Sequence, residues 1–156
     1  PAWEEDGLIL TESLAICLHI ARPRGGHAGP LTPGEVSQAE NWALFAATSI
    51  EPDALAIMSA VNAGQAETDT GRGAIEKAVT GLARSLRRLE ALLGGQDWLV
   101  DARFTVADVM VAECLRYGTA HAPLLPPWPA VAALLTRCQA PPAYRRMCEE
   151  RMAEPA

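Results

Sequence analysis

The stretch from Asp6 to Ile16 (DGLILTESLAI) constrains the fold of this chain more than any other. Asp6-Gly7 lies between two short strand-like runs, and glycine accepts a positive φ without steric cost, so the pair predicts a hairpin turn. Residues 8–10 (LIL) are apolar throughout, which predicts a strand covered on both faces. Apolar residues recur between positions 14 and 20 and predict a short buried helix directly after the strand.

Glu12 and Ser13 fall where the predicted strand meets the predicted helix. The first turn of a helix presents unpaired N–H groups and the positive end of the helix dipole. These N–H groups and the Ser13 hydroxyl can hold a carboxylate, while the Glu12 carboxylate can accept hydrogen bonds from an ammonium. The pair therefore fits an α-amino-acid head group. The alternative is that Thr11 or Ser13 only caps the helix.

Residues 32–35 (TPGE) are a second strong helix signal. Thr32 is suited to the N-cap, Pro33 to the first helical position, and Glu35 to the reciprocal bond of a capping box. An alanine-rich stripe follows, which permits close approach of another helix. The proline at position 52 predicts a kink in this helix after Glu51.

Residues 62–73 are polar and glycine-rich and predict a loop. From position 75 to 93, apolar residues are spaced by four and three, which predicts a core-facing helix that ends at Gly94-Gly95. The charged residues of this helix predict a solvated face rather than a binding patch; they are Arg84, Arg87, Arg88 and Glu90.

Residues 104–109 (FTVADV) form the next signature. Thr105 can cap a helix while the Asp108 carboxylate reaches back to the Thr105 N–H, as in a capping box with aspartate in place of glutamate. The predicted role of Thr105 and Asp108 is structural. The proline-punctuated remainder predicts two short terminal helices.

Composition excludes several classes of function. The formal net charge of −6 argues against nucleic acid as a partner. No apolar run is long enough to cross a bilayer, so we expect no membrane partner. The four cysteines and three histidines are scattered without ligand spacing. We therefore predict reduced, largely buried thiols, no metal and a cytoplasmic protein.

Residues 1–3 (PAW), the Asp6-Gly7 turn, residues 8–10 and residues 11–16 (TESLAI) resemble the second half of the thioredoxin-like domain of cytosolic glutathione transferases. The capping box at 105–108 resembles the one that starts the central helix of that family. The resemblance implies a mainly α fold, with a partial thioredoxin-like β-hairpin plus helix followed by an all-α C-terminal domain. We expect the glutathione-binding part at 1–22, a linker at 23–31 and the helical domain at 32–156.

The resemblance also implies binding residues. Glu12 and Ser13 would hold the γ-glutamyl group of glutathione. Pro1 would be the proline that opens the strand, next to the residue whose backbone pairs with the cysteine moiety. The catalytic Ser, Tyr or Cys of the family would then precede Pro1, so we expect a truncated chain without a catalytic residue and without turnover by itself.

In the family, the helix that follows the linker lines a hydrophobic substrate pocket and helps to form the dimer interface. Trp42 and Phe45 are the candidates for these surfaces, with Ser49 and Asp53 after them. Tyr117 is a further pocket candidate. The alternative for the three aromatic residues is a plain place in the core.

The function implied for the complete form is a detoxifying glutathione S-transferase. The glutathione thiolate, as substrate, would attack a small hydrophobic electrophile in a cytoplasmic homodimer. The alternative is a non-catalytic transferase-like module that binds other proteins. The Glu12-Ser13 pair favours the enzyme, because a docking module has no need of an amino-acid head-group site.

Overall fold

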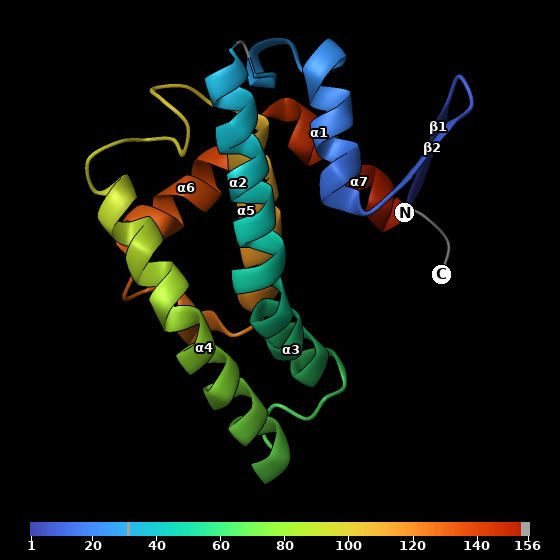
Figure 1. Cartoon of the computed structure of the whole chain (residues 1–156). Coiled ribbons are helices and arrows are strands. Elements are labelled where there is room, and N and C mark those ends of the chain that lie inside the picture. The colour runs from blue at the N-terminus through green and yellow to red at the C-terminus, as the bar shows by residue number, and fades with distance from the viewer. Residues whose placement is uncertain (31, 154–156) are drawn as a thin grey trace.

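A computed structural model describes residues 1–30 and 32–153 (Figure 1). The strands are β1 (Ala2–Glu5) and β2 (Leu8–Thr11), and short 3₁₀ helices cover Gly26–Ala28 and Ala122–Leu124. The α-helices are α1 (Ser13–Arg24), α2 (Pro33–Ser49), α3 (Glu51–Asn62), α4 (Asp69–Leu93), α5 (Val106–Gly118), α6 (Pro129–Gln139) and α7 (Pro142–Ala153). The predicted class, mainly α with one hairpin, is confirmed.

Helix α5 forms the centre of the helical part, because it packs against α1, α2, α3 and α6. Figure 1 shows α2 and α3 as one column in front of α5, with the long α4 along its side. Helix α4 contacts α3 and α6. Most of the described residues of α5 are buried, and they are flanked by alanines of α2 that allow the two helices to approach closely.

The hairpin forms as predicted. Strands β1 and β2 are antiparallel, with Ala2 opposite Thr11, and the turn residues Asp6 and Gly7 have φ values of 48° and 81°. The prediction that β2 is covered on both faces is wrong, since Leu8 is 44% and Ile9 68% exposed. The hairpin projects from the helices (Figure 1), and within the described chain no element covers its outer face.

Two predicted boundaries differ from the structure. Helix α4 begins at Asp69, inside the predicted loop 62–73, because Thr68 caps it by accepting from the Gly71 N–H at 3.0 Å. A Cβ at Gly71 would lie 1.8 Å from the Gln65 carbonyl oxygen, so this glycine serves close packing and not a loop. Helix α1 runs to Arg24, into the predicted linker 23–31. Position 31 of that linker and the last three positions of the predicted helical domain lie outside the described residues.

The predicted start of the helix at Thr32 and the predicted end of the long helix at Gly94 are confirmed. Thr32 and Glu35 form the predicted capping box, and α4 ends just before Gly94. The column bends by 44° between α2 and α3, at Ile50, one residue before the predicted kink at Glu51-Pro52. No single helix among the described residues is long and apolar enough to span a membrane; α2 and α3 pass that test only together, as this bent pair.

Candidate functional site

The junction between β2 and α1 holds the predicted Glu12-Ser13 pair in an unusual backbone conformation. Glu12 has φ 70° and ψ 111°, a positive φ that side chains rarely adopt and that costs on the order of 1–3 kcal/mol. Ser13 is the first residue of α1, and both side chains are exposed. In the described chain no side chain caps α1, so the alternative that Thr11 or Ser13 serves only as a cap finds no support.

Pro1 lies at the same end of the hairpin as this pair. Ala2 is opposite Thr11 in the antiparallel register, so Pro1 precedes the strand at the point where Glu12 follows its partner. The hairpin therefore brings together the residues predicted to bind glutathione. The α1 helix closes its first turn directly over the pair, with the Ile16 N–H donating to the Glu12 carbonyl at 3.0 Å.

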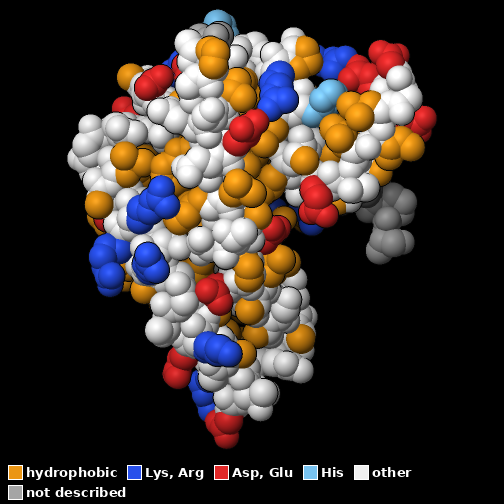
Figure 2. All heavy atoms as spheres, viewed as in Figure 1, with side chains coloured by type: hydrophobic (Ala, Val, Ile, Leu, Met, Phe, Trp, Pro, Cys, Tyr) orange, Lys and Arg blue, Asp and Glu red, His pale blue; other side chains and the backbone are white. Residues whose placement is uncertain are grey.

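Beside this junction lies a cavity of about 470 Å³ between α1 and α2, which we call the α1–α2 cavity. Glu12 and Ser13 line it, together with the carboxylates of Glu40 and Glu51. Its remaining lining is apolar and comes from Leu14, Ala15, Leu18, Ala43, Leu44 and Ala47. Figure 2 shows this face of the molecule, with hydrophobic and acidic side chains exposed beside the α2–α3 column.

Sequence reasoning missed the α2 and α3 side of this cavity. Glu40, Leu44, Ala47 and Glu51 recur at intervals of four, three and four residues, so they share one face of a helical column. That spacing was the signal that could have found them. It was masked by the alanine stripe, which has the same period and faces the core.

The predicted substrate-pocket residues gather at a different place, the α2–α4 cavity of about 450 Å³. Phe45, Ser49 and Asp53 line it, facing Arg84 and Arg88 of α4. The structure therefore does not bring these candidates to the α1–α2 cavity.

Trp42 and Tyr117 line neither cavity among the described residues. Trp42 is buried and packs edge-to-face on Phe45, with ring centroids 5.3 Å apart. Tyr117 is half-buried against the core, with the Arg116 guanidinium 5.2 Å from its ring centroid. Both places agree with the alternative of a core residue.

The three predicted arginines of α4 are exposed, as expected of a solvated face, and Glu90 is half-buried; Arg88 and Glu90 also make structural contacts. The Arg88 guanidinium lies 4.6 Å from the ring centroid of Phe45 and 5.1 Å from that of Trp42, a cation–π arrangement. The Glu90 carboxylate accepts hydrogen bonds from the Ala130 and Val131 N–H groups at 3.0 and 3.1 Å. Glu90 thus satisfies the N-terminus of α6.

The predicted capping box of α5 is confirmed and extends further than predicted. The Asp108 carboxylate accepts from the Thr105 N–H at 2.7 Å and from the Thr105 hydroxyl at 3.1 Å, while the Thr105 hydroxyl accepts from the Ala107 N–H at 3.3 Å. The other Asp108 oxygen accepts from the Leu99 N–H at 2.8 Å. Burial raises the pKa of Asp108, and these hydrogen bonds oppose that rise.

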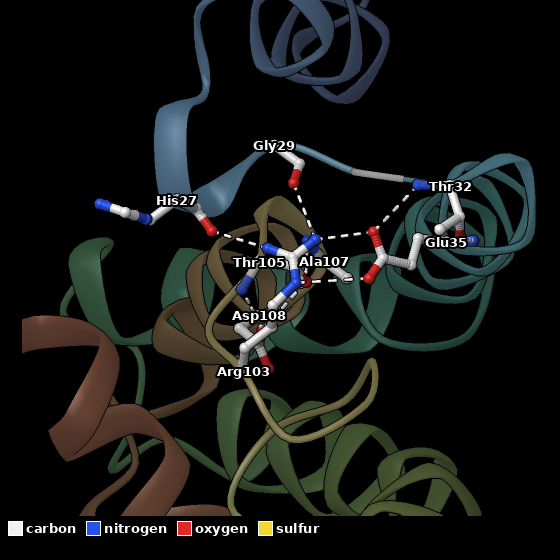
Figure 3. Close-up of polar contacts among 8 residues, drawn as sticks. All are labelled: His27, Gly29, Thr32, Glu35, Arg103, Thr105, Ala107 and Asp108. Atoms are coloured by element: carbon white, nitrogen blue, oxygen red, sulfur yellow. Dashed lines mark hydrogen bonds and ion pairs between the residues drawn. The ribbon is translucent and has the colours of Figure 1, made fainter.

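Arg103 was not predicted as a functional or structural residue from the sequence. Its side chain links the segment between α1 and α2 to the loop before α5 (Figure 3). Its guanidinium donates to the carbonyls of His27 and Gly29 at 2.7 and 2.9 Å and to both carboxylate oxygens of Glu35 at 3.3 and 2.7 Å. Glu35, 7% exposed, also accepts from the Thr32 N–H at 3.3 Å. We call this set of contacts the Arg103 clamp; it fixes the segment between α1 and α2 to the loop before α5.

Burial makes three of the four thiols harder to ionise, those of Cys17, Cys114 and Cys138. Burial is the main cause that raises the pKa of Cys114 and of Cys138 to about 12, and it also raises the pKa of Cys17. All four thiols are free. Within the described residues, no group of three or more His, Cys, Asp or Glu side chains is arranged to hold a metal ion.

Known proteins resemble the chain in sequence and in structure. Residues 45–142 match the family model described as glutathione S-transferase, C-terminal domain. Elongation factor 1-gamma of Trypanosoma cruzi is 34% identical over 115 residues, which are 72% of this chain and 26% of that protein. The chain thus spans about a quarter of the length of this curated relative.

Two solved structures share both the fold and part of the sequence. The theta class glutathione S-transferase of Xanthomonas axonopodis pv. citri, in its apo form, superposes with a TM-score of 0.79 at 26% identity, over 94% of this chain and 78% of that chain. A glutathione transferase family member of Pseudomonas fluorescens Pf-5, with two glutathione bound, superposes with a TM-score of 0.73 at 26% identity, over 89% and 63% of the two chains.

Proposed function

The chain belongs to the family defined by the glutathione S-transferase C-terminal domain, and from this we propose that it binds glutathione through Glu12 and Ser13. The observation that carries the proposal is the positive φ of Glu12. Strained residues persist where the surrounding structure holds them, and they cluster at ligand-binding positions. Here the strained residue lines an open cavity, and the solved relative from Pseudomonas fluorescens holds glutathione.

Each group of the γ-glutamyl head finds a partner in this proposal. The Ser13 hydroxyl and the first N–H groups of α1 donate to the carboxylate, with the helix dipole adding to the attraction. The Glu12 carboxylate accepts from the ammonium. Pro1 lies at the same end of the hairpin, where it opens the strand that runs beside the cysteine moiety.

The proposed reaction is conjugation of glutathione to a hydrophobic electrophile. The glutathione thiolate forms a C–S bond, the leaving group departs with its electron pair, and the thiol proton passes to solvent. The apolar wall of the α1–α2 cavity suits the electrophile. We assign no residue of this chain to activation of the thiol, so binding is the part of the function that this chain is proposed to perform.

We also propose a cytoplasmic homodimer whose interface includes the α2–α4 cavity. Asp53 and Arg84 line that cavity together with Phe45 and Ser49. A surface that carries both charges and an aromatic edge can pair with its own copy across a two-fold axis.

A non-catalytic interaction module is the second candidate. The observation that favours it is the similarity to elongation factor 1-gamma, whose name describes a translation factor and not a transferase. Glutathione separates the two candidates, because a docking module has no need to retain the Glu12-Ser13 site. Retention of the chain on immobilised glutathione, with release by free glutathione, supports the transferase.

Calorimetric titration of glutathione into Ser13→Ala tests the site itself. Loss of the hydroxyl donor to a carboxylate weakens binding by about 1–3 kcal/mol relative to the unaltered chain. Ser37→Ala is the matched control, since Ser37 is also exposed near the start of a helix but lines neither cavity described above. Equal affinity of Ser13→Ala and the unaltered chain contradicts the role of Ser13, and no binding by the unaltered chain favours the docking module.

A further inference from the structure

The α1–α2 cavity carries charge of one sign. Three carboxylates line it, those of Glu12, Glu40 and Glu51, and none of its described lining residues is a lysine, arginine or histidine. The three differ in how far their charge is already compensated. Glu40 is paired with the Arg22 guanidinium at 2.7 Å. Glu12 is assigned to the ammonium of glutathione in the function proposed above, which leaves Glu51.

Glu51 is the uncompensated carboxylate of this cavity. It is half-buried, and in the described part of the chain it forms no hydrogen bond or ion pair. Its position as the first residue of α3 accounts for this, because the N-terminus of a helix stabilises negative charge without a side-chain partner. Its field also reaches the interior, where it contributes to the raised pKa of the buried Cys114.

Glu51 and Ser13 line the same cavity, with the apolar side chains of Leu44 and Ala47 as further parts of its wall. The function proposed above places the electrophile against this apolar wall, so a group attached to the glutathione sulfur would share the half-enclosed cavity with the Glu51 side chain. Like charges repel more strongly there than in bulk water, because the surroundings screen them less.

We propose that Glu51 makes this site selective by charge, so that its second substrate is an apolar molecule with a positive charge or none, and anionic electrophiles are disfavoured. The inference rests on the proposed glutathione function and adds a specificity-determining residue to it. For a charged group a few ångströms from Glu51, we expect a preference of about five- to tenfold for the cation over the anion.

The test compares three glutathione conjugates of nearly equal size in calorimetric titrations of the whole chain. S-benzylglutathione is neutral at the S-substituent, S-(4-carboxybenzyl)glutathione is anionic and S-(4-aminomethylbenzyl)glutathione is cationic. The expected order of affinity is cationic, then neutral, then anionic. Added salt is expected to narrow the differences, because it screens partly exposed charges.

Glu51→Gln assigns the preference to this residue. It keeps the shape of the side chain and is expected to bring the anionic and cationic conjugates to within about twofold of each other while the neutral conjugate binds as before. Glu40→Gln is unsuitable as a control within the cavity, because it would leave the Arg22 guanidinium without its partner. Glu76→Gln, on the exposed side of α4, is the control outside the cavity. Circular dichroism establishes that each variant folds.

The outcomes separate the two proposals. If glutathione and all three conjugates bind but with equal affinity, the charge preference is overturned and the glutathione function stands. A preference that persists in Glu51→Gln, or that disappears in Glu76→Gln, overturns the role of Glu51. If neither glutathione nor any conjugate binds to the unaltered chain, the proposed function fails and this inference fails with it. The comparison in the unaltered chain tests the charge preference itself even if the Glu51→Gln variant does not fold.

Discussion

Asp108 shows how much of a single residue's role is local and how much depends on the fold. Its bond to the Thr105 N–H is set by a spacing of three residues, so the sequence predicted it. Its bond to the Leu99 N–H is not, because that donor lies in a loop whose path is fixed only when the helices pack. The side chain is 0% exposed, so every donor that it satisfies would otherwise be buried without a partner.

We therefore predict that Asp108→Asn destabilises the chain by about 2–3 kcal/mol in urea unfolding. The amide can accept through one atom only, and its NH₂ group faces an N–H donor that the carboxylate had satisfied. Asp101→Asn is the control, because Asp101 is exposed and its φ of 52° suits asparagine. An unchanged unfolding midpoint for Asp108→Asn would contradict the role of this network in stability.

At the candidate site, the position of Glu12 follows from the local sequence, whereas the position of Glu51 depends on how the helices pack. Glu12 and Ser13 are adjacent in the chain, so their pairing at a strand-to-helix junction could be predicted from the sequence. Glu51 is far from them in sequence and reaches the same cavity only because α2 and α3 form one bent column beside α1. Its helical spacing from Glu40 and Ala47 places it on their face of the column, but that spacing alone does not show that the face lines a cavity.

At the scale of elements, the helix starts at Thr32 and Thr105 were predicted from a complete local capping signal, and the start of α1 from the apolar pattern that follows the strand. The start of α4 was missed because the glycines at 71 and 73 are breakers by propensity. At Gly71, tertiary packing overrides that propensity, since no larger residue fits against the Gln65 carbonyl. The position of the helices relative to one another depends on contacts such as the Arg103 clamp, which no spacing in the sequence reveals.

We predict that Arg103→Gln lowers the free energy of unfolding by about 2–4 kcal/mol, because it leaves the buried Glu35 carboxylate without its cation and removes the donors to two backbone carbonyls. Arg103→Lys is expected to recover only part of this loss, since an ammonium cannot reproduce the fork of donors that reaches Glu35 and the two carbonyls. Urea unfolding measures both.

Arg87→Gln is the matched control for the clamp, because Arg87 is an exposed arginine of α4. Limited proteolysis gives a second measurement that separates the clamp from a general loss of stability. In Arg103→Gln, cleavage is expected to appear first in the segment between α1 and α2, which the clamp holds in place. If Arg103→Gln and Arg87→Gln unfold at the same urea concentration, the Arg103 clamp does not contribute to stability as described.

At the scale of the whole molecule, the fold places two thiols in its interior where water cannot stabilise a thiolate. Cys114 lies on α5 and Cys138 on α6, and both are buried in the core between these packed helices. The sequence predicted buried, reduced cysteines from the apolar pattern around them. The sequence could not show which thiols are the most deeply buried, because the burial of each one depends on which helix face points to the centre of the fold.

The buried thiols predict that the chain loses stability in alkali. Burial raises the pKa of Cys114 and of Cys138 from about 9 to about 12, so between these values the folded chain retains protons that the unfolded chain has released. The unfolded state then binds fewer protons than the folded state. The free energy of unfolding is therefore highest below about pH 9 and falls as the pH rises toward 12, by up to about 1.4 kcal/mol per pH unit for each thiol.

Urea unfolding at pH 7.5 and at pH 10.5 measures this dependence of stability on pH. Cys138→Ala is expected to flatten it, whereas Ser37→Ala, at an exposed position of α2 that carries no thiol, is expected to leave it unchanged. Equal slopes in Cys138→Ala and in the unaltered chain would show that the Cys138 thiol does not ionise with unfolding in this range.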